Sequence, residues 1–177
     1  VTDAQLERIV GAAQRASTSS NLQAWTVIAI RDADRKRRIS QAIGDHHYVE
    51  HAPVFLVWAA DLARNAALIR SRGIEPETLG FIEHTLLGAI DVGIAAQTML
   101  LGAAEMGLSG CMIGSFKPDL KAALLLPENF EIALVVAFGK GEESIEIVDA
   151  ADSVKYYRDE AGRHYVPKRT LEEIIVK

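Results

Sequence analysis

The stretch EHTLLGAIDVGIAAQTMLLGAAEM, residues 83–106, predicts the longest helix of the chain and the centre of its fold. At 1.5 Å per residue, such a helix is roughly 36 Å long. Apolar residues occur nearly all round it, so we expect it to be buried. Recurring glycine and alanine make it slim, which lets another backbone pass close by. Gly107 followed by Leu108 predicts a Schellman cap at its end.

Helix and strand signals alternate on the N-terminal side of this long helix. Thr2 and Gln5 form a capping box, and apolar residues then recur at helical spacing. In order, the sequence predicts a first helix ending before residue 17, a strand over 25–30, a second helix over 33–43, a polar loop over 45–48, a buried strand over 53–60, and a short helix within a surface excursion over 61–82.

The C-terminal side continues with shorter elements. These are a strand over 110–114, a helix over 117–126, a strand over 132–138, a hairpin built from 154–158 and 164–166, and a last helix opened by the capping box of Thr170 and Glu173. This order predicts an α+β or α/β sandwich. We expect one domain over residues 1–150 with a C-terminal arm over 151–177. The G-x-G-x-x-G turn of a Rossmann site is absent from the sequence.

Composition excludes several classes of protein. A chain of 177 residues suits one domain, and its net charge of -5 argues against nucleic acid as the main partner. One cysteine rules out a disulfide framework and fits a reducing, cytoplasmic compartment. Asp91 and Gln97 interrupt the most apolar stretch, 86–101, so we do not expect a membrane span.

The sequence offers no evident nucleophile. It contains no G-x-S-x-G elbow, and Cys111 lies in an apolar strand, where packing is its expected role.

Three neighbouring histidines, at positions 46, 47 and 51, raise the question of a metal site. Gly44 and Pro53 leave little room for a helix that would align His47 with His51, and no H-E-x-x-H pattern is present. We therefore expect no metal.

Two segments have residues suited to a polar, flat ligand. The loop Ser17–Gln23 offers hydroxyls and amides between a helix and a strand, although such a loop also simply ends a helix. The glycines at the ends of Gly110–Gly114 allow a flat ligand to approach the backbone, although they also fit an ordinary strand end.

Two further segments have residues suited to charge or edge contacts. Lys168 and Arg169 precede a helix N-terminus, which favours a phosphate, although a solvated basic pair fits equally. His46 follows the second helix and can offer a ring nitrogen to a ligand edge, or it is a solvated loop residue.

Taken together, these segments resemble the nitroreductase family of flavoproteins. STSSNLQAWTVIAI, residues 17–30, is similar to the family's Ser-rich N-x-Q-x-W loop and strand. Residues 86–114 are similar to its central helix and G-x-x-x-IG strand. RDEAGRHYVPKRTLEEII, residues 158–175, is similar to the C-terminal arm of short members.

The resemblance implies a nitroreductase-like sandwich, with a mixed, mainly antiparallel sheet flanked by helices, and an intertwined homodimer with FMN at its interface. Relatives usually carry an Arg-rich segment before the first helix, where this sequence begins. Within this sequence the implied FMN contacts are Thr18, Ser19 and Asn21 on a flavin held mainly by the partner, Ile113 and Gly114 near the isoalloxazine ring, Lys168 and Arg169 at the phosphate, and His46 where relatives often place an amide facing the flavin.

The implied activity is that of an FMN-dependent oxidoreductase. In ping-pong turnover, NADPH or NADH gives a hydride to the flavin, and a flat acceptor such as a nitroaromatic or quinone then takes the electrons. The flavin carries the chemistry, so we assign no catalytic residue. The basic run 35–38 can attract a 2′-phosphate or be a solvated helix face. The partners we expect are a second copy and a small-molecule acceptor, without nucleic acid or membrane.

Other functions also fit the sequence. The same scaffold hosts dehalogenases and flavin-modifying enzymes, for which the excursion 61–82 would act as a lid. A relative that binds FMN without turnover is a different class. The small residues of 83–106 fit either a dimer interface or a helix buried within one subunit.

Overall fold

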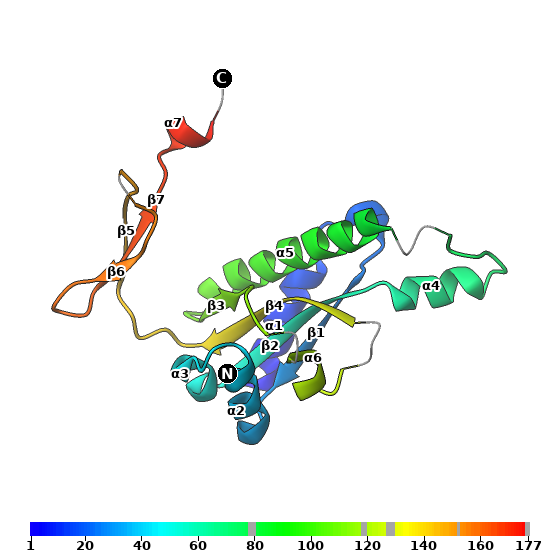
Figure 1. Cartoon of the computed structure of the whole chain (residues 1–177), viewed down its shortest axis with the longest axis horizontal. Helices are drawn as coiled ribbons and strands as arrows, with labels where there is room; N and C mark the ends of the chain where they lie inside the picture. Colours follow the sequence, from blue (N-terminus) through cyan, green and yellow to red (C-terminus); the bar gives the residue numbers. More distant parts are fainter. Residues whose placement is uncertain (78–80, 118–119, 127–129, 152, 176–177) are drawn as a thin grey trace. The chain divides into compact units, whose positions relative to one another are not determined.

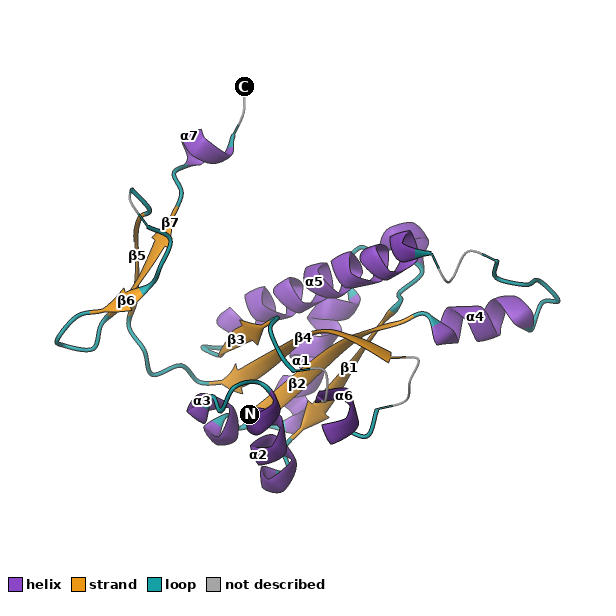
Figure 2. Cartoon of the chain, viewed as in Figure 1, coloured by secondary structure: helices purple, strands orange, loops and turns teal. Residues whose placement is uncertain are grey.

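The computed structural model describes residues 1–77, 81–117, 120–126, 130–151 and 153–175. The chain forms two compact units, Val1–Lys140 and Gly141–Lys177. Figure 1 follows the chain through both units, and Figure 2 distinguishes their helices from their strands.

A four-stranded sheet forms the centre of the first unit. Every neighbouring pair of its strands is antiparallel, so the expected mainly antiparallel sheet is confirmed. β2 is buried along its whole length, because both faces of the sheet are covered. The strand order is β1 (Trp25–Ile30), β2 (Val54–Asp61), β4 (Phe130–Gly139) and β3 (Ser109–Ile113).

Helices cover both faces of this sheet, which confirms the α+β sandwich (Figures 1 and 2). One face packs on α1 (Asp3–Gln14) and α5 (Ile82–Ala104). The other core contains residues of α2 (Ala33–Ala42), α3 (His47–His51) and α6 (Leu120–Ala123). Alternate residues of β2 serve the two cores: Leu56 and Trp58 pack in the first, Phe55 and Val57 in the second.

Local signals set the ends of the helices. The Thr2 and Gln5 capping box is present, with both reciprocal bonds. At the C-terminal end of α5, the Leu108 N–H donates to the Ala103 carbonyl at 3.0 Å and the Gly107 N–H donates to the Ala104 carbonyl at 3.0 Å. Gly107 has φ 65°, so the Schellman cap is confirmed.

Only one face of α5 is buried in the single chain, so the expectation of burial all round is wrong. Val92, Ala95, Ala96, Met99 and Ala103 are fully buried. The opposite side exposes an apolar stripe, which we call the α5 stripe, in which each side chain is between 39% and 63% exposed: Leu86, Leu87, Ile90, Ile94 and Leu101. By length and composition alone α5 could also cross a membrane, although it packs on α1 and β2.

The glycines of α5 differ in whether packing within the subunit requires them. A Cβ on Gly88 would lie 3.0 Å from the Ala60 Cβ, and one on Gly102 would lie 3.1 Å from the Ala12 Cβ. These two glycines therefore allow close packing within the subunit. A Cβ on Gly93 would meet nothing within 4 Å, so this glycine is not required by packing in the single chain.

The polar loop expected over 45–48 is wrong at its end, where α3 begins. Val49 of α3 is fully buried in the second core. The buried Lys36 ammonium donates to the carbonyls of Glu50 and Ala52 at 3.1 and 2.7 Å, which ties this short helix to α2. A five-residue helix is stable only through such tertiary contacts.

Other boundaries shift slightly. The excursion expected over 61–82 contains α4 (Ala63–Arg70), and its residues 78–80 lie outside the described residues. The helix expected over 117–126 is described only as α6, since 118–119 lie outside the described residues.

The second unit contains a three-stranded sheet of order β5 (Ile145–Asp149), β7 (His164–Lys168) and β6 (Tyr157–Arg158), followed by α7 (Leu171–Ile174). β6 and β7 form the expected antiparallel hairpin. β5, which the sequence patterns did not predict, pairs in parallel with β7. The capping box of Thr170 and Glu173 is confirmed.

Polar contacts of Glu143 and Asp159 join neighbouring segments of this unit. The Glu143 carboxylate binds the Arg158 guanidinium at 2.7 Å and the His164 ring nitrogen Nδ1 at 3.0 Å. The hydrogen bonds from Arg158 and then His164 lower the pKa of Glu143 below its usual value. The Asp159 carboxylate accepts the backbone N–H groups of Ala161 and Arg163 in the hairpin turn, and these bonds contribute to lowering its pKa.

Candidate functional site

The Ser-rich loop, residues 17–24, connects α1 to β1 and has an unusual backbone. It contains a single 3-10 turn, η1 (Ser19–Asn21), and three non-glycine residues in left-handed conformation: Ser20 at φ 47°, Asn21 at φ 54° and Gln23 at φ 49°. Each such residue costs about 1 kcal/mol or more. The surrounding structure must therefore impose this conformation.

One anchor of the loop comes from α5. The Ser19 backbone N–H donates to Asp91 Oδ1 at 3.0 Å. Asp91 is 3% exposed, in a helix that is otherwise mostly apolar. In the sequence, Asp91 only argues against a membrane span; its bond to Ser19 could not be predicted, because it joins residues 72 positions apart.

A second anchor comes from α4. Arg64 Nη2 donates to the Leu22 and Gln23 carbonyls at 3.1 and 2.8 Å. The buried Asn65 side chain adds a bond from Nδ2 to the Leu22 carbonyl at 3.1 Å. Groups from two helices thus hold the loop at both ends, which accounts for its strained backbone.

The groups that remain for a ligand are few and defined. Thr18 Oγ1 accepts the Gln23 N–H at 3.1 Å, and Asn21 Oδ1 accepts from Gln23 Nε2 at 3.3 Å. In the described part of the chain, the Ser19 hydroxyl and the Asn21 amide nitrogen have no hydrogen bond, and Asn21 is exposed. The loop therefore offers a hydroxyl and an amide donor to the edge of a ligand.

The end of β3 offers backbone rather than side chains. The Ile113 side chain is 8% exposed and packs in the second core. Gly114 is exposed, and a Cβ placed there would meet nothing within 4 Å. A flat ligand could approach the backbone here, as the sequence suggested, but the Ile113 side chain does not line that surface.

His46 lies near β3. Its ring stacks on Tyr48 with centroids 5.3 Å apart, and the Tyr48 hydroxyl is 3.8 Å from Cys111 Sγ in β3. Tyr48 thus lies between His46 and β3, both of which contain predicted ligand contacts. Cys111 itself is exposed, so the packing role predicted for it is wrong; its strand lies at the edge of the sheet.

The sheet separates the two main groups of predicted contacts. β1, which follows the Ser-rich loop, and β3, which ends at Ile113, form opposite edges of the sheet with β2 and β4 between them. The first unit therefore brings His46 close to β3, but leaves Thr18, Ser19 and Asn21 at the other edge.

The predicted phosphate residues belong to the second unit. Lys168 and Arg169 are exposed and have no ion-pair partner among the described residues. The helix after them contributes less than expected, because α7 has four residues and Glu173 Oε2 already accepts the Thr170 N–H at 2.8 Å. A phosphate would depend on the two cations rather than on this helix terminus.

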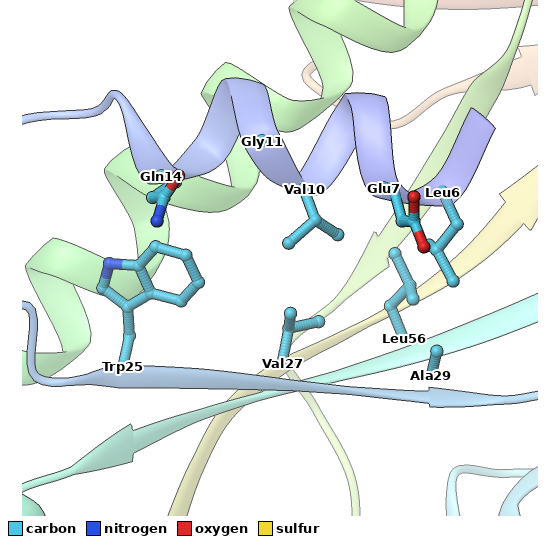
Figure 3. A pocket seen from close by; sticks show the side chains of 9 residues that line it. All are labelled: Leu6, Glu7, Val10, Gly11, Gln14, Trp25, Val27, Ala29 and Leu56. Atoms are coloured by element: carbon cyan, nitrogen blue, oxygen red, sulfur yellow. The ribbon is translucent and has the colours of Figure 1, made fainter. Parts of the chain in front are cut away.

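A groove of about 490 Å³ lies elsewhere, between α1 and β1 (Figure 3). Its walls are mainly aliphatic, with Leu6 and Val10 facing Val27 and Leu56. The only charged side chain in its lining is the carboxylate of Glu7, which would repel a phosphate. The groove contains none of the predicted site residues, so we do not assign the ligand to it.

The basic run 35–38 is largely occupied by structural contacts. Besides Lys36 in its carbonyl clamp, Arg35 donates to the Leu124 carbonyl at 3.3 Å and Arg37 pairs with Asp34 at 2.9 Å. The solvated or structural interpretation of this run is therefore favoured over a 2′-phosphate site.

The histidine pair differs from the expectation. α3 does align His47 with His51, whose ring centroids are 4.3 Å apart. Among the described residues there is no group of three or more side chains able to hold a metal.

The chain is similar to known flavin-dependent proteins. A profile of the Nitroreductase family matches residues 1–140. An NADPH-flavin oxidoreductase of Vibrio harveyi is 35% identical over 83% of this chain and 60% of its own length. An FMN reductase (NADPH) of Bacillus subtilis is 37% identical over 68% of this chain and 49% of its own length.

A solved structure extends the match. The Vibrio harveyi NADPH:FMN oxidoreductase complexed with NAD+ superposes with a TM-score of 0.77 at 30% identity, covering 98% of this chain and 73% of that one. The chain spans about half to three fifths of the length of the curated relatives named above.

Proposed function

This chain belongs to the nitroreductase family, as its sequence resemblance predicted, and we propose that it acts as an FMN-dependent oxidoreductase. The electron donor is NADPH or NADH, and the acceptor is a small flat molecule such as a nitroaromatic or a quinone. The observation that carries the proposal is the Ser-rich loop, whose Ser19 hydroxyl and Asn21 amide are left available on a backbone fixed by buried groups. The names of the relatives support the same cofactor.

The residues present suit FMN. Thr18, Ser19 and Asn21 supply hydroxyl and amide groups for the polar edge of the ring, and Gly114 exposes backbone to its face. Lys168 and Arg169 supply two positive charges for the phosphate dianion. When bound, FMN supplies the hydride and electron chemistry that the described side chains do not.

A complete site requires two copies of the chain. The Ser-rich loop and β3 lie at opposite edges of one sheet, so a ligand that contacts both would have to bridge two subunits. The α5 stripe is the surface that we assign to the second copy, because a contiguous apolar surface on a soluble protein marks an interface. A two-fold axis would place the stripe against its own copy.

The same surface accounts for the apolarity of α5 without a membrane. The buried face of α5 packs on the sheet, and its buried carboxylate, Asp91, already binds the Ser-rich loop. We therefore propose a soluble, cytoplasmic homodimer rather than a protein with α5 inserted in lipid.

The protein's own groups bind and orient; we assign none of them to proton transfer. Asp91 is buried beneath the Ser-rich loop and is engaged by Ser19. The cationic pair balances the phosphate charge. The Ser-rich loop and the Gly114 backbone would hold a flat acceptor close to a bound cofactor and so favour electron transfer through proximity.

The test is a visible absorption spectrum of the purified protein after addition of FMN and removal of the unbound excess. We expect a retained flavin band that NADPH or NADH bleaches without oxygen and that a quinone restores. Colourless protein contradicts the cofactor assignment. A bound flavin that stays oxidised with both nucleotides contradicts the enzyme and supports the non-catalytic FMN-binding relative.

A further inference from the structure

We propose that Asp91 is a positioning residue that fixes the Ser-rich loop in the conformation that binds the flavin. The inference rests on the proposed function, which supplies the ligand. It deepens that function by assigning the geometry of the cofactor loop to a residue that does not touch the cofactor.

Burial of the Asp91 carboxylate would destabilise the fold if the carboxylate made no hydrogen bond. A carboxylate that is 3% exposed in an apolar helix loses its water and requires hydrogen bonds in return. Its side chain accepts the Ser19 N–H at 3.0 Å. An aliphatic side chain at the same position would suit the packing of α5, whose neighbouring Val92 and Ala95 are fully buried. What the carboxylate provides is the bond to the loop.

That bond acts at the start of the strained turn. Ser19 is the first residue of η1, and the next two residues, Ser20 and Asn21, have positive φ. Because the bond fixes the backbone N–H of Ser19, it restricts the direction of the Ser19 side chain. It also fixes the position at which the two left-handed residues begin. The Ser19 hydroxyl and the Asn21 amide are therefore oriented before any ligand arrives, which reduces the entropy lost on binding.

The other anchors do not replace Asp91. Arg64 and Asn65 bind the carbonyls of Leu22 and Gln23, beyond the turn. The Thr18 hydroxyl binds the Gln23 N–H and closes the loop on itself without attaching it to the core. Among these contacts, only the bond to Asp91 attaches the turn to α5.

Two substitutions separate the hydrogen bond from the packing. Asp91→Leu removes the acceptor and puts a larger, apolar side chain in its place, whereas Asp91→Asn keeps the size and an oxygen acceptor without the charge. Val92→Ala is the matched control, because it weakens the same helix at a fully buried position. The readouts are the FMN dissociation constant, the melting temperature, and amide hydrogen exchange of the loop in the absence of flavin.

We expect Asp91→Leu to weaken FMN binding about tenfold or more, the worth of a buried charged hydrogen bond, and to accelerate exchange of the loop. Asp91→Asn recovers most of the loss. Val92→Ala lowers the melting temperature but leaves exchange of the loop and FMN affinity close to wild type. FMN affinity that depends on the hydrogen-bond acceptor at position 91, and not on the stability of the protein, supports a positioning role for Asp91.

Unchanged loop exchange in Asp91→Leu overturns the proposal, as does an FMN loss in Val92→Ala that matches its loss of stability. Failure of the proposed function gives a different result. If the wild type does not bind FMN while Asp91→Leu still releases the loop, the anchor is real and the assignment of the ligand is wrong.

Discussion

The Ser-rich loop and the basic pair at residues 168–169 are predicted to hold the same ligand, yet they are built in opposite ways. The loop is conformationally restricted, because helices α4 and α5 bind it at both ends, and its backbone is strained. Lys168 and Arg169 are exposed and without ion-pair partners in the described part of the chain. The loop contributes fixed geometry, whereas the pair contributes charge, and the two should respond differently to mutation, salt and pH.

The largest effect should come from separating the two copies that the proposed site requires. Ile94→Glu places a charge in the α5 stripe, where the side chain is 43% exposed in the single chain. We expect a stable dimer to become a monomer in sedimentation, with FMN affinity reduced about 100-fold or more, since a buried unpaired charge costs several kcal/mol.

The matched control for the stripe is Leu125→Glu, which adds the same charge at an exposed leucine outside α5. It should leave both dimer and affinity unchanged. A dimer that persists in Ile94→Glu, or a wild type that is monomeric at micromolar concentration, would remove the two-copy site.

The next largest effect should come from removing the basic pair, Lys168 and Arg169. Replacing both Lys168 and Arg169 by alanine should weaken FMN binding about 100-fold, because two charge-assisted bonds to phosphate are lost. Riboflavin, which lacks the phosphate, should bind both proteins equally, and the remaining FMN affinity should depend less on salt. Fluorescence titration measures all three quantities.

Lys155→Ala is the control for that pair, since it removes an exposed cation from the same unit. Equal losses of affinity for FMN and riboflavin in the double variant would show that the pair stabilises the structure and does not bind the phosphate.

A smaller effect tests the strain of the loop. Ser20→Gly should raise the free energy of unfolding by about 0.5 kcal/mol, because relief of about 1 kcal/mol of left-handed strain exceeds the added freedom of the unfolded chain. FMN affinity should fall slightly as the turn loosens. Ser17→Gly, in the same loop but without positive φ, should lower stability in chemical denaturation; the opposite ranking would contradict the strain.

The smallest effect is a difference in acid sensitivity. The pKa of Glu143 is lowered by Arg158 and His164, so its stabilisation is complete above its usual pKa of 4.5 and is lost as pH falls through the lowered value. Protection against hydrogen exchange, taken relative to the intrinsic rate at the same pH, should therefore fall in acid in the second unit before it falls in the Ser-rich loop, whose anchors are partly buried. Glu143→Gln should remove this acid-induced loss of protection; an earlier loss in the loop would contradict the prediction.

Much of the fold could be predicted because its signals are local. The Thr2 and Thr170 capping boxes and the Gly107 cap depend on residues three to five positions apart, and all three form. The hairpin of β6 and β7 is also a short-range feature. The Ser-rich loop could be recognised as a candidate contact for the same reason, since its composition interrupts two periodic segments.

The parts that were missed depend on partners far along the chain. α3 exists because Val49 finds a core and Lys36 binds its last carbonyls. β5 pairs in parallel with a strand that lies beyond the hairpin turn. Cys111 is exposed because β3 falls at the sheet edge, which its own apolar sequence does not reveal.

The sequence by itself determined the family and the order of most of the elements, and it proposed candidate residues for contact with a flavin. Tertiary structure decided that the loop and β3 lie on opposite edges, that one face of α5 is uncovered in the single chain, and that Asp91 binds Ser19. The physical reason is range: caps and turns are settled between neighbours in sequence, whereas burial and a bond across 72 residues exist only after the chain has packed.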